Sequence, residues 1–413
     1  MEIFFLLSLA LGLLLPYGIY FLGKVHVRGG FAGQAPSAEA ATRNLSHCAP
    51  KVGVIIPLTG DTPVMKACLE SLLDQSYPNY EAIFVTCNSI DPAVQIVNRV
   101  IQTKRNAQHI VSGAASRCSQ KNHNLLAGVA DLDPSIEILV FCDCTHWAPE
   151  RFLADLVSPI VSGKAVMTTG FHRVVPGDCR LPTLGMLVSV MAIHLMQGIG
   201  FITQPWGGAT AISRRIFEEN GIKALWAENV VDDVSMCIHL AKAGIRVRPV
   251  SSACMLTPIG GVTFRAWYGW LKRQIFFIKV CQPATWAAGT IVAYLLCAPF
   301  LAGLACAAGI MGFAPKYMTV AGYAFLAGFL VIAMKWRTLI HEDIPMWRWI
   351  PAALAASSMT VLCYACTWFS NLLPWRGISY RVTWGGKVAS VRHYPLKSTT
   401  ELPAKAGKPE DLW

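Results

Sequence analysis

Residues Lys51–Ser89, KVGVIIPLTGDTPVMKACLESLLDQSYPNYEAIFVTCNS, contain two β-rich runs separated by a helical pattern. The run KVGVIIP predicts a first strand, and Glu81–Thr86 predicts a second. Between them, Thr62 suits a helix cap and Pro63 suits the first helical position. A strand, a helix and a second strand in this order are typical of a parallel α/β sheet.

The same alternation continues toward the middle of the chain. We predict further helices and strands, in chain order, at Pro92–Lys104, His109–Ser112, Asn122–Ala130 and Ile136–Cys142. In such sheets ligands bind beyond the carboxyl ends of the strands. Asp91 and Asp143 both follow predicted strand ends, so we expect them to belong to one site.

The ends of the chain have a different composition from its middle. Of 413 residues, 54% are hydrophobic and 14% are charged, and apolar blocks of membrane-spanning length lie at both ends. The block Ile3–Gly23 predicts an uncleaved anchor, and Lys24 and Arg28 directly after it favour a cytoplasmic location for the middle of the chain. Three further blocks suit membrane helices: Thr285–Ala308, Met318–Trp336 and Ile350–Phe369. We therefore expect an integral, multi-pass membrane protein whose soluble-looking middle is on the cytoplasmic face.

These patterns divide the chain into six parts. We predict an anchor at 1–23, a linker at 24–50, an α/β domain at 51–263, an interfacial amphipathic helix at 264–283, transmembrane helices at 284–372 and a basic tail at 373–413. The interfacial helix would direct its aromatic side chains toward lipid and its basic ones toward headgroups. The net charge of +11 has no basic run with interleaved aromatics, so it favours anionic lipid or a phosphorylated substrate and not nucleic acid.

The stretch VFCDCTHWAP, residues 140–149, places two cysteines and a histidine around Asp143. A structural zinc site needs a second pair of ligands, and none occurs at a usual spacing. We therefore expect Cys142 and Cys144 to be small buried residues and Asp143 to lie on the opposite face of the strand. A carboxylate oxygen there would suit a hard cation.

Carboxylates after strand ends suit a nucleotide-sugar site. One would accept hydrogen bonds from the base or ribose, a second would hold a cation against the diphosphate, and a third would act as general base. The pair Asp232 and Asp233, in VVDDVSM, could supply the third, and Arg273 could stabilise charge on a leaving phosphate. For any one carboxylate, a helix cap or a solvated loop charge is the alternative.

Seven motifs together carry a family resemblance over about Val52–Val382. They are SLLDQSYPNYEAIFV, DPA at Asp91, KNHNL at Lys121, CDCT at Asp143, WGGATAISRR at Trp206, DD at Asp232 and PWRGISYRV near the C-terminus. As an ordered set they resemble family 2-like glycosyltransferases, and most closely the ceramide glucosyltransferase family.

The resemblance implies a GT-A nucleotide-sugar-binding domain with a Rossmann-like mixed sheet. It also implies roles for individual residues: nucleotide-sugar binding by Asp91, Lys121 and Asp143, an Mg²⁺ or Mn²⁺ ion on Asp143, catalysis by Asp233 as base with Arg273, and an acceptor-side loop at Trp206, Gly207 and Gly208. The partners implied are a UDP-sugar, a membrane lipid acceptor and the bilayer.

Two departures from the family pattern stand out. The family usually has Arg or Gln, two residues, then Arg-Trp, whereas Trp270–Gln274, WLKRQ, keeps only Arg273. A short insertion in the alignment would instead keep Trp270 and lose its arginine. Thr145 stands where many relatives in the wider superfamily have a second aspartate, which weakens the case for a metal.

The leading hypothesis is an inverting transfer of a sugar from a UDP-sugar to the hydroxyl of a lipid such as ceramide, with glucose as the leading candidate for the sugar. The alternatives are a hopanoid or other lipid glycosyltransferase using UDP-N-acetylglucosamine, a transferase acting on polyprenyl phosphate, and a processive polysaccharide synthase. From another class comes a catalytically silent membrane protein that binds nucleotide-sugar or lipid.

Overall fold

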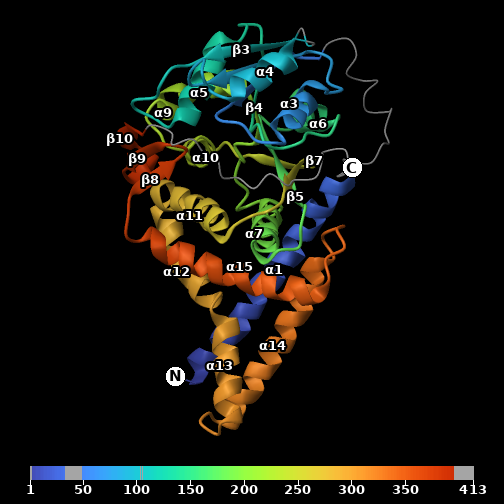
Figure 1. The fold of residues 1–413 in the computed structure, drawn as a ribbon, viewed down its shortest axis with the longest axis vertical. Coiled ribbons are helices and arrows are strands. Elements are labelled where there is room, and N and C mark those ends of the chain that lie inside the picture. The colour runs from blue at the N-terminus through green and yellow to red at the C-terminus, as the bar shows by residue number, and fades with distance from the viewer. Residues whose placement is uncertain (1, 33–48, 103, 105, 395–413) are drawn as a thin grey trace. The chain divides into compact units, whose positions relative to one another are not determined.

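The computed structural model describes residues 2–32, 49–102, 104 and 106–394. The chain forms two compact units (Figure 1). The first, which we call the helical unit, contains Met1–Val27, Val175–Ile199 and Ile259–Ser370. The second, the sheet unit, contains Arg28–Val174, Gly200–Pro258 and Asn371–Trp413.

The sheet unit is built on a seven-stranded sheet with strand order β3-β2-β1-β4-β6-β5-β7. The strands are β1 (Val52–Pro57), β2 (Tyr80–Thr86), β3 (Ala107–Val111), β4 (Ile138–Cys142), β5 (Met167–Pro176), β6 (Ala209–Ser213) and β7 (Arg248–Ile259). β3, β2, β1 and β4 are parallel, whereas β6 is antiparallel to both β4 and β5. The α/β prediction is confirmed as a mixed sheet, of which the strand–helix alternation indicated the parallel half.

Helices cover both faces of this sheet because alternate strand residues point to opposite sides. Val54 and Ile56 of β1 pack with the helices of one face, and Ile55 packs with those of the other. The first face carries α3 (Met65–Leu73), α4 (Ala93–Ile101) and α6 (Phe152–Val161). The second carries α5 (Gln120–Asp131), α8 (Arg214–Glu219), α9 (Ile222–Trp226) and α10 (Asp233–Lys242).

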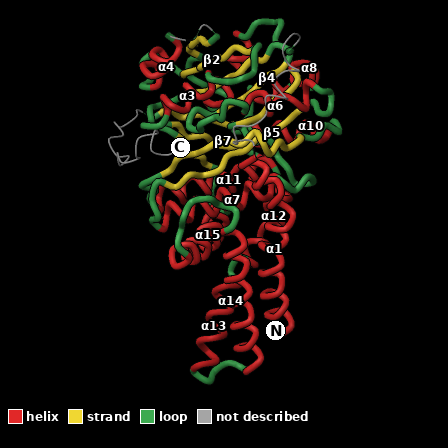
Figure 2. Tube along the Cα trace, turned by 90° about the vertical axis from the view of Figure 1, so that its right-hand side faces the viewer, coloured by secondary structure: helices red, strands yellow, loops and turns green. Residues whose placement is uncertain are grey.

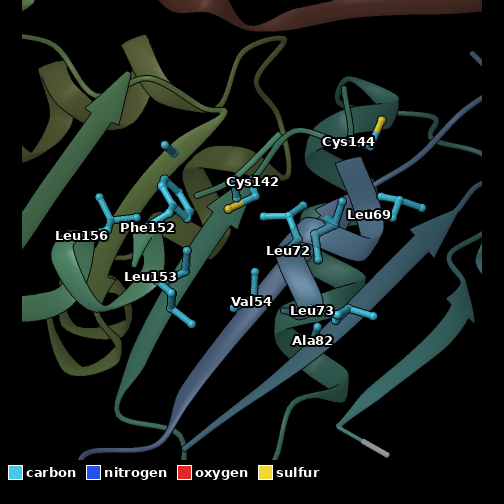
Figure 3. Close-up of a cluster of buried hydrophobic side chains, with 14 of the residues drawn as sticks. Val54, Leu69, Leu72, Leu73, Ala82, Cys142, Cys144, Phe152, Leu153 and Leu156 are labelled. Carbon is cyan, nitrogen blue, oxygen red and sulfur yellow. The ribbon is translucent and has the colours of Figure 1, made fainter. Parts of the chain in front are cut away.

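Cys142 and Cys144 belong to the buried cluster on the first face (Figure 3). Cys142 is fully buried and Cys144 is 8% exposed. Burial raises the pKa of both thiols, that of Cys144 to about 12, so neither provides a thiolate near neutral pH. The prediction that these cysteines are packing residues is confirmed.

Two helix starts differ from the sequence prediction. α3 begins at Met65 and not at Pro63, because residues 62–64 form a turn closed by the Met65 N–H on the Thr62 carbonyl at 3.0 Å. α5 begins at Gln120, two residues earlier than expected, because the Ser119 hydroxyl accepts the Asn122 N–H at 3.1 Å. That cap places Lys121 in the first turn of α5.

The helical unit contains the apolar segments. Its helices are α1 (Glu2–Ala32, to Val27 in this unit), α7 (Leu181–Gln197), α11 (Phe264–Cys281), α12 (Pro283–Leu295), α13 (Ala298–Ile310), α14 (Lys316–Arg337) and α15 (Met346–Thr367). In the part of the chain that the structure describes, four helical stretches are long and apolar enough to cross a membrane: Glu2–Gly30, Pro283–Ile310, Lys316–Arg337 and Met346–Thr367. α13 and α14 run side by side (Figure 2).

Two apolar segments differ in detail from the prediction. The first helix continues beyond Gly23 to Ala32, so the expected linker begins inside it, and residues 33–48 lie outside the described residues. The block expected as one helix at Thr285–Ala308 is divided into α12 and α13. Pro299 lies in the first turn of α13, where a proline suits a helix start and cannot continue the preceding helix.

α11 occupies the range expected for the amphipathic helix, but its aromatic residues do not all point outward. Trp267 is fully buried, and its indole N–H donates to the Ser189 hydroxyl of α7 at 3.1 Å. Its ring lies against Gly185, where any side chain would overlap it. The expectation that these aromatics face lipid is wrong for Trp267, whereas Phe264 is 52% exposed.

Part of the expected basic tail is folded in the sheet unit. β8 (Leu372–Trp375), β9 (Ile378–Val382) and β10 (Val388–His393) form a separate antiparallel sheet in the order β10-β9-β8. The Tyr380 hydroxyl accepts the Gln120 N–H at 3.1 Å, and the Val230 N–H donates to the Gly386 carbonyl at 2.9 Å. This small sheet therefore holds the first turn of α5 and the loop before α10. Residues 395–413 of the tail lie outside the described residues.

Candidate functional site

The predicted residues of the sheet unit lie at the carboxyl ends of its parallel strands. β1 pairs with β2 on one side and with β4 on the other, so the strand order reverses at β1. In such sheets ligands bind at the carboxyl ends of the strands, beside this reversal. Asp91 follows β2 and Asp143 follows β4. Because β6 is antiparallel to β4, the loop before β6 reaches the same end, and the Asp143 N–H donates to the Gly208 carbonyl at 3.3 Å.

Lys121 is the centre of a charged cluster. Its Nζ lies 3.0 Å from Asp143 Oδ1 and 3.0 Å from Asp232 Oδ2, and it donates to the Gly207 carbonyl at 3.2 Å. The side chains of Lys121 and Asp232 are 15% and 5% exposed. Burial by itself would lower the pKa of Lys121, but Asp143, Asp232 and Asp233 outweigh it and raise that pKa well above its ordinary value. Lys121 therefore stays charged and neutralises part of the acidic cluster.

Asp233 lies beside this cluster at the start of α10. The Gly207 N–H donates to its Oδ2 at 2.9 Å, and the Val234 N–H donates to its Oδ1 at 2.7 Å. Burial, and then the charge of Asp232, raise the pKa of Asp233 to about 7, against the opposing effects of Lys121 and the two N–H groups. A carboxyl group with a pKa near the working pH is suited to accept a proton from a hydroxyl.

This pKa predicts a pH dependence. A general base works in its deprotonated form, so kcat/KM should rise with pH, reach half its plateau near pH 7 and be about tenfold below the plateau at pH 6. Initial rates of sugar transfer between pH 5.5 and 9 would measure this dependence. A flat kcat/KM profile would contradict the assignment.

The same raised pKa of Asp233 also affects folding. The folded state binds the proton more tightly than the unfolded chain does, so this group lowers stability as pH rises from about 4 to about 7.

Gly207 has no room for a side chain. A Cβ atom there would overlap Asp232 Oδ2 and Lys121 Nζ, so Gly207→Ala must displace one or both charged groups of the buried ion pair. We expect a loss of about 1–3 kcal/mol in unfolding free energy. We also expect transfer activity to fall by more than the loss of folded protein explains. Gly200→Ala is the matched control, because nothing lies within 4 Å of its Cβ position, and it should change stability by less than ~0.5 kcal/mol. Equal melting temperatures for both variants would contradict this packing argument.

Asp91 joins two loops at the neighbouring strand ends. Its Oδ1 accepts the Gly60 N–H at 2.8 Å and the Ala93 N–H at 2.9 Å, and its Oδ2 accepts the Thr59 hydroxyl at 3.1 Å. The carboxylate thus fixes the loop after β1 to the start of α4. Its expected contact with the nucleotide remains a prediction.

Two buried histidines adjoin the site and were missed from the sequence as a pair. His146 Nδ1 and His172 Nδ1 lie 2.6 Å and 2.5 Å from the Thr257 hydroxyl, and the Trp206 ring stacks on His172 at 4.6 Å. Burial lowers the pKa of His146 to about 3 and that of His172 well below its usual range, so both rings are neutral. The two histidines pack against Trp206 of the expected acceptor-side loop. They are far apart in the sequence, so no local motif indicated that they form a pair.

Asp143 provides one available carboxylate oxygen for a cation. Its side chain is 33% exposed, Lys121 engages Oδ1, and Oδ2 lies 4.0 Å from His146 Nε2. Among the described residues, no group of three or more His, Cys, Asp or Glu could hold a metal. A carboxylate oxygen is a ligand for hard cations such as Mg²⁺, which often take their other ligands from substrate phosphates and water. The expected cation on Asp143 remains a prediction.

The structure brings most of the predicted residues into one unit. Lys121, Asp143, Asp233 and Gly207 are in mutual contact or share a partner, and Asp91 lies at the adjacent strand end. Arg273 lies on α11 in the helical unit, and its expected role at the diphosphate remains a prediction. Asp232 completes the cluster as the second carboxylate partner of Lys121.

Comparison with known proteins gives a consistent result. The model of a family described as glycosyl transferase family 21 matches residues 11–388. A mannosyltransferase from Pyrobaculum calidifontis, solved in complex with GDP-Man and Mn2+, has 18% identity and a TM-score of 0.50 over 87% of this chain and 99% of its own. At that identity the likeness establishes the fold alone.

A second solved structure is less similar. Glucosyl-3-phosphoglycerate synthase from Mycobacterium tuberculosis, in complex with Mn2+ and UDP-Glc, has 14% identity and a TM-score of 0.36. It covers 59% of this chain and 83% of its own. No curated protein shows a significant sequence match.

Proposed function

This chain belongs to glycosyl transferase family 21. We propose that it transfers a sugar, with glucose as the leading candidate, from a UDP-sugar to the hydroxyl of a membrane lipid such as ceramide. It is a glycosyltransferase with a GT-A-like α/β unit and four helices that fit a membrane protein. The observation that carries the proposal is Asp233. It is a carboxyl group with a pKa of about 7, held by the Gly207 N–H beside the Lys121 cluster.

The proposed reaction assigns one step to each of these groups. Asp233 takes the proton of the acceptor hydroxyl, whose oxygen forms a bond to the anomeric carbon of the sugar. The bond from that carbon to the diphosphate oxygen breaks on the opposite side, and its electron pair leaves with UDP. A single displacement inverts the anomeric configuration. A divalent cation held by Asp143 and the donor phosphates would supply positive charge to the leaving group.

The membrane helices support a lipid as the acceptor. Four long apolar segments would place the sheet unit at a bilayer surface, where lipid hydroxyls are available. Lys24 and Arg28, at the end of the first apolar segment, favour the cytoplasmic face for the sheet unit, where nucleotide-sugars are present. In this proposal the multi-pass chain uses a cytoplasmic donor and a membrane acceptor.

A product screen tests the proposal. The full chain in lipid nanodiscs would be incubated with each of several UDP-sugars and with GDP-mannose, together with a total lipid extract. Arms with Mg²⁺, Mn²⁺ or EDTA would test the cation, and glycolipid mass would be measured. We expect one hexose added to a lipid from a UDP-sugar, absent with Asp233→Asn. A polymer, a product on polyprenyl phosphate, or nucleotide-sugar binding without any product would overturn it.

The same screen separates the related lipid acceptors. A mass increase of one N-acetylhexosamine on a hopanoid would replace glucose and ceramide while leaving inverting transfer to a lipid intact. Purified ceramide and UDP-glucose would then be tested directly. Transfer at the rate seen with the extract would support the specific pair, and no transfer with this pair would exclude it.

A further inference from the structure

The turn between β8 and β9 contains an arginine in an unusual backbone conformation. Arg376 has φ +47°, and Gly377 after it has φ +77°. Among the described residues, Arg376 is the one non-glycine with positive φ. Such turns favour Gly, Asn or Asp, because an L side chain at positive φ is strained. A long basic side chain in this place indicates a function for its charge.

The Arg376 side chain reaches the loop that follows β1. Its Nη1 donates to the Thr59 carbonyl at 2.7 Å. The hydroxyl of Thr59 and the N–H of Gly60 both donate to Asp91, so the arginine contacts the loop that Asp91 fixes. The guanidinium group has five N–H donors, the Thr59 bond uses one, and the side chain is exposed. The remaining donors are therefore available to a ligand beside Asp91.

The bond to the Thr59 carbonyl places the Arg376 side chain at the carboxyl end of β1. β1 lies between β2 and β4 in the sheet, and Asp91 and Asp143 follow those two strands. In such sheets ligands bind beyond the carboxyl ends of the strands, at the point where the strand order reverses. Arg376 therefore lies at the edge of the sheet where a nucleotide diphosphate would bind.

Lys121 cannot serve the same purpose without a cost. Its ammonium group already contacts Asp143, Asp232 and the Gly207 carbonyl, so binding a phosphate would compete with buried ion pairs. The Arg376 guanidinium group donates to a backbone carbonyl and not to a carboxylate, and a guanidinium fork matches two phosphate oxygens at once. In the sheet unit, Arg376 is therefore the better-placed cation for a diphosphate.

We propose that Arg376 binds the diphosphate of the nucleotide-sugar and stabilises the negative charge that develops on it as the sugar is transferred. This inference rests on the proposed function. As the bond between the anomeric carbon and the diphosphate oxygen breaks, its electron pair moves to that oxygen, and N–H groups of Arg376 would donate hydrogen bonds to the diphosphate. The acceptor proton moves to Asp233, so the step is balanced without another reactant.

Arg376→Gly tests the proposal without disturbing the turn. Glycine adopts positive φ without strain, so the variant keeps the turn and loses only the side chain and its bond to the Thr59 carbonyl. Binding of UDP, GDP and uridine would be measured by calorimetry on the full chain in nanodiscs, with Mg²⁺ present. We expect about 10- to 100-fold weaker UDP binding and unchanged uridine binding, because only UDP carries the diphosphate. Arg376→Lys should recover part of the affinity.

Arg381→Ala is the matched control. Arg381 is an exposed arginine on β9, and its replacement should leave UDP binding unchanged. Equal UDP affinity of Arg376→Gly and the natural chain would overturn the role of Arg376 while leaving the proposed function intact. An equal loss for UDP and uridine would also overturn it, because that pattern indicates a purely structural effect. If the natural chain bound neither UDP nor GDP, the proposed function itself would fail.

Discussion

Asp233→Asn is expected to reduce sugar transfer by roughly 10²-fold or more, the usual contribution of a general base. Asparagine has nearly the same shape as aspartate but cannot accept the acceptor proton. Its carbonyl oxygen can still accept the N–H of Gly207 or that of Val234, and the other donor would then face the amide nitrogen. That mismatch costs about 1–3 kcal/mol, partly offset because a buried carboxyl no longer ionises. Donor binding should change little.

Single-turnover transfer and UDP affinity would be measured on the same preparation of this variant. Asp131→Asn, which alters an exposed aspartate of α5, is the matched control and should retain full activity. The residual activity of Asp233→Asn should also lose the pH dependence near pH 7, because the group responsible is absent. Near-normal turnover with a preserved pH profile would exclude Asp233 as the base.

Lys121→Met is expected to destabilise the sheet unit by about 3–5 kcal/mol, the usual cost of removing one partner from a buried ion pair. The substitution keeps much of the apolar length of the side chain and removes the charge between Asp143 and Asp232. Asp232 is 5% exposed and would have no opposite charge nearby, so it must either be protonated or draw in water. Thermal and denaturant unfolding of the full chain would measure the loss, and transfer activity should fall with it.

Two further variants isolate the electrostatic part of this effect. Lys66→Met removes an exposed ion pair with Glu70 at 3.6 Å and should cost less than ~1 kcal/mol. Lys121→Met combined with Asp232→Asn should recover part of the stability, because the uncompensated buried charge is gone, but it should not restore activity. If Lys121→Met were no less stable than Lys66→Met, the charged cluster would have no structural role.

Local patterns in the sequence were sufficient for much of the sheet unit. β1, β2 and β4 are short apolar runs, buried on both faces, and they lie close to where such runs predict strands. Asp91 and Asp143 follow strand ends, and the parallel pairing of β2, β1 and β4 brings those ends to one edge. The packing of Cys142 followed from its position in a buried strand.

The helix start at Met65 and the burial of Trp267 were less predictable, because each depends on a contact that competes with the local sequence pattern. Thr62 and Pro63 have the right chemistry for a helix start, yet a turn closed by the Thr62 carbonyl delays the helix to Met65. Trp267 lies in an amphipathic pattern that suits an interface, yet the space beside Gly185 and the Ser189 hydroxyl hold it inside. Neither partner is near Trp267 in the sequence.

The sequence by itself determined the kinds of chemical group and their order: a parallel α/β half, apolar segments at both ends, carboxylates after strands and the adjacent acids Asp232 and Asp233. Only the tertiary structure decided which of these groups interact. Lys121 joins Asp143 to Asp232, Gly207 holds Asp233, and Arg376 reaches Thr59 from the other end of the chain. The reason is that residue type and local spacing are written along the chain, whereas pKa values and ion pairs depend on burial and on distances between segments far apart in it.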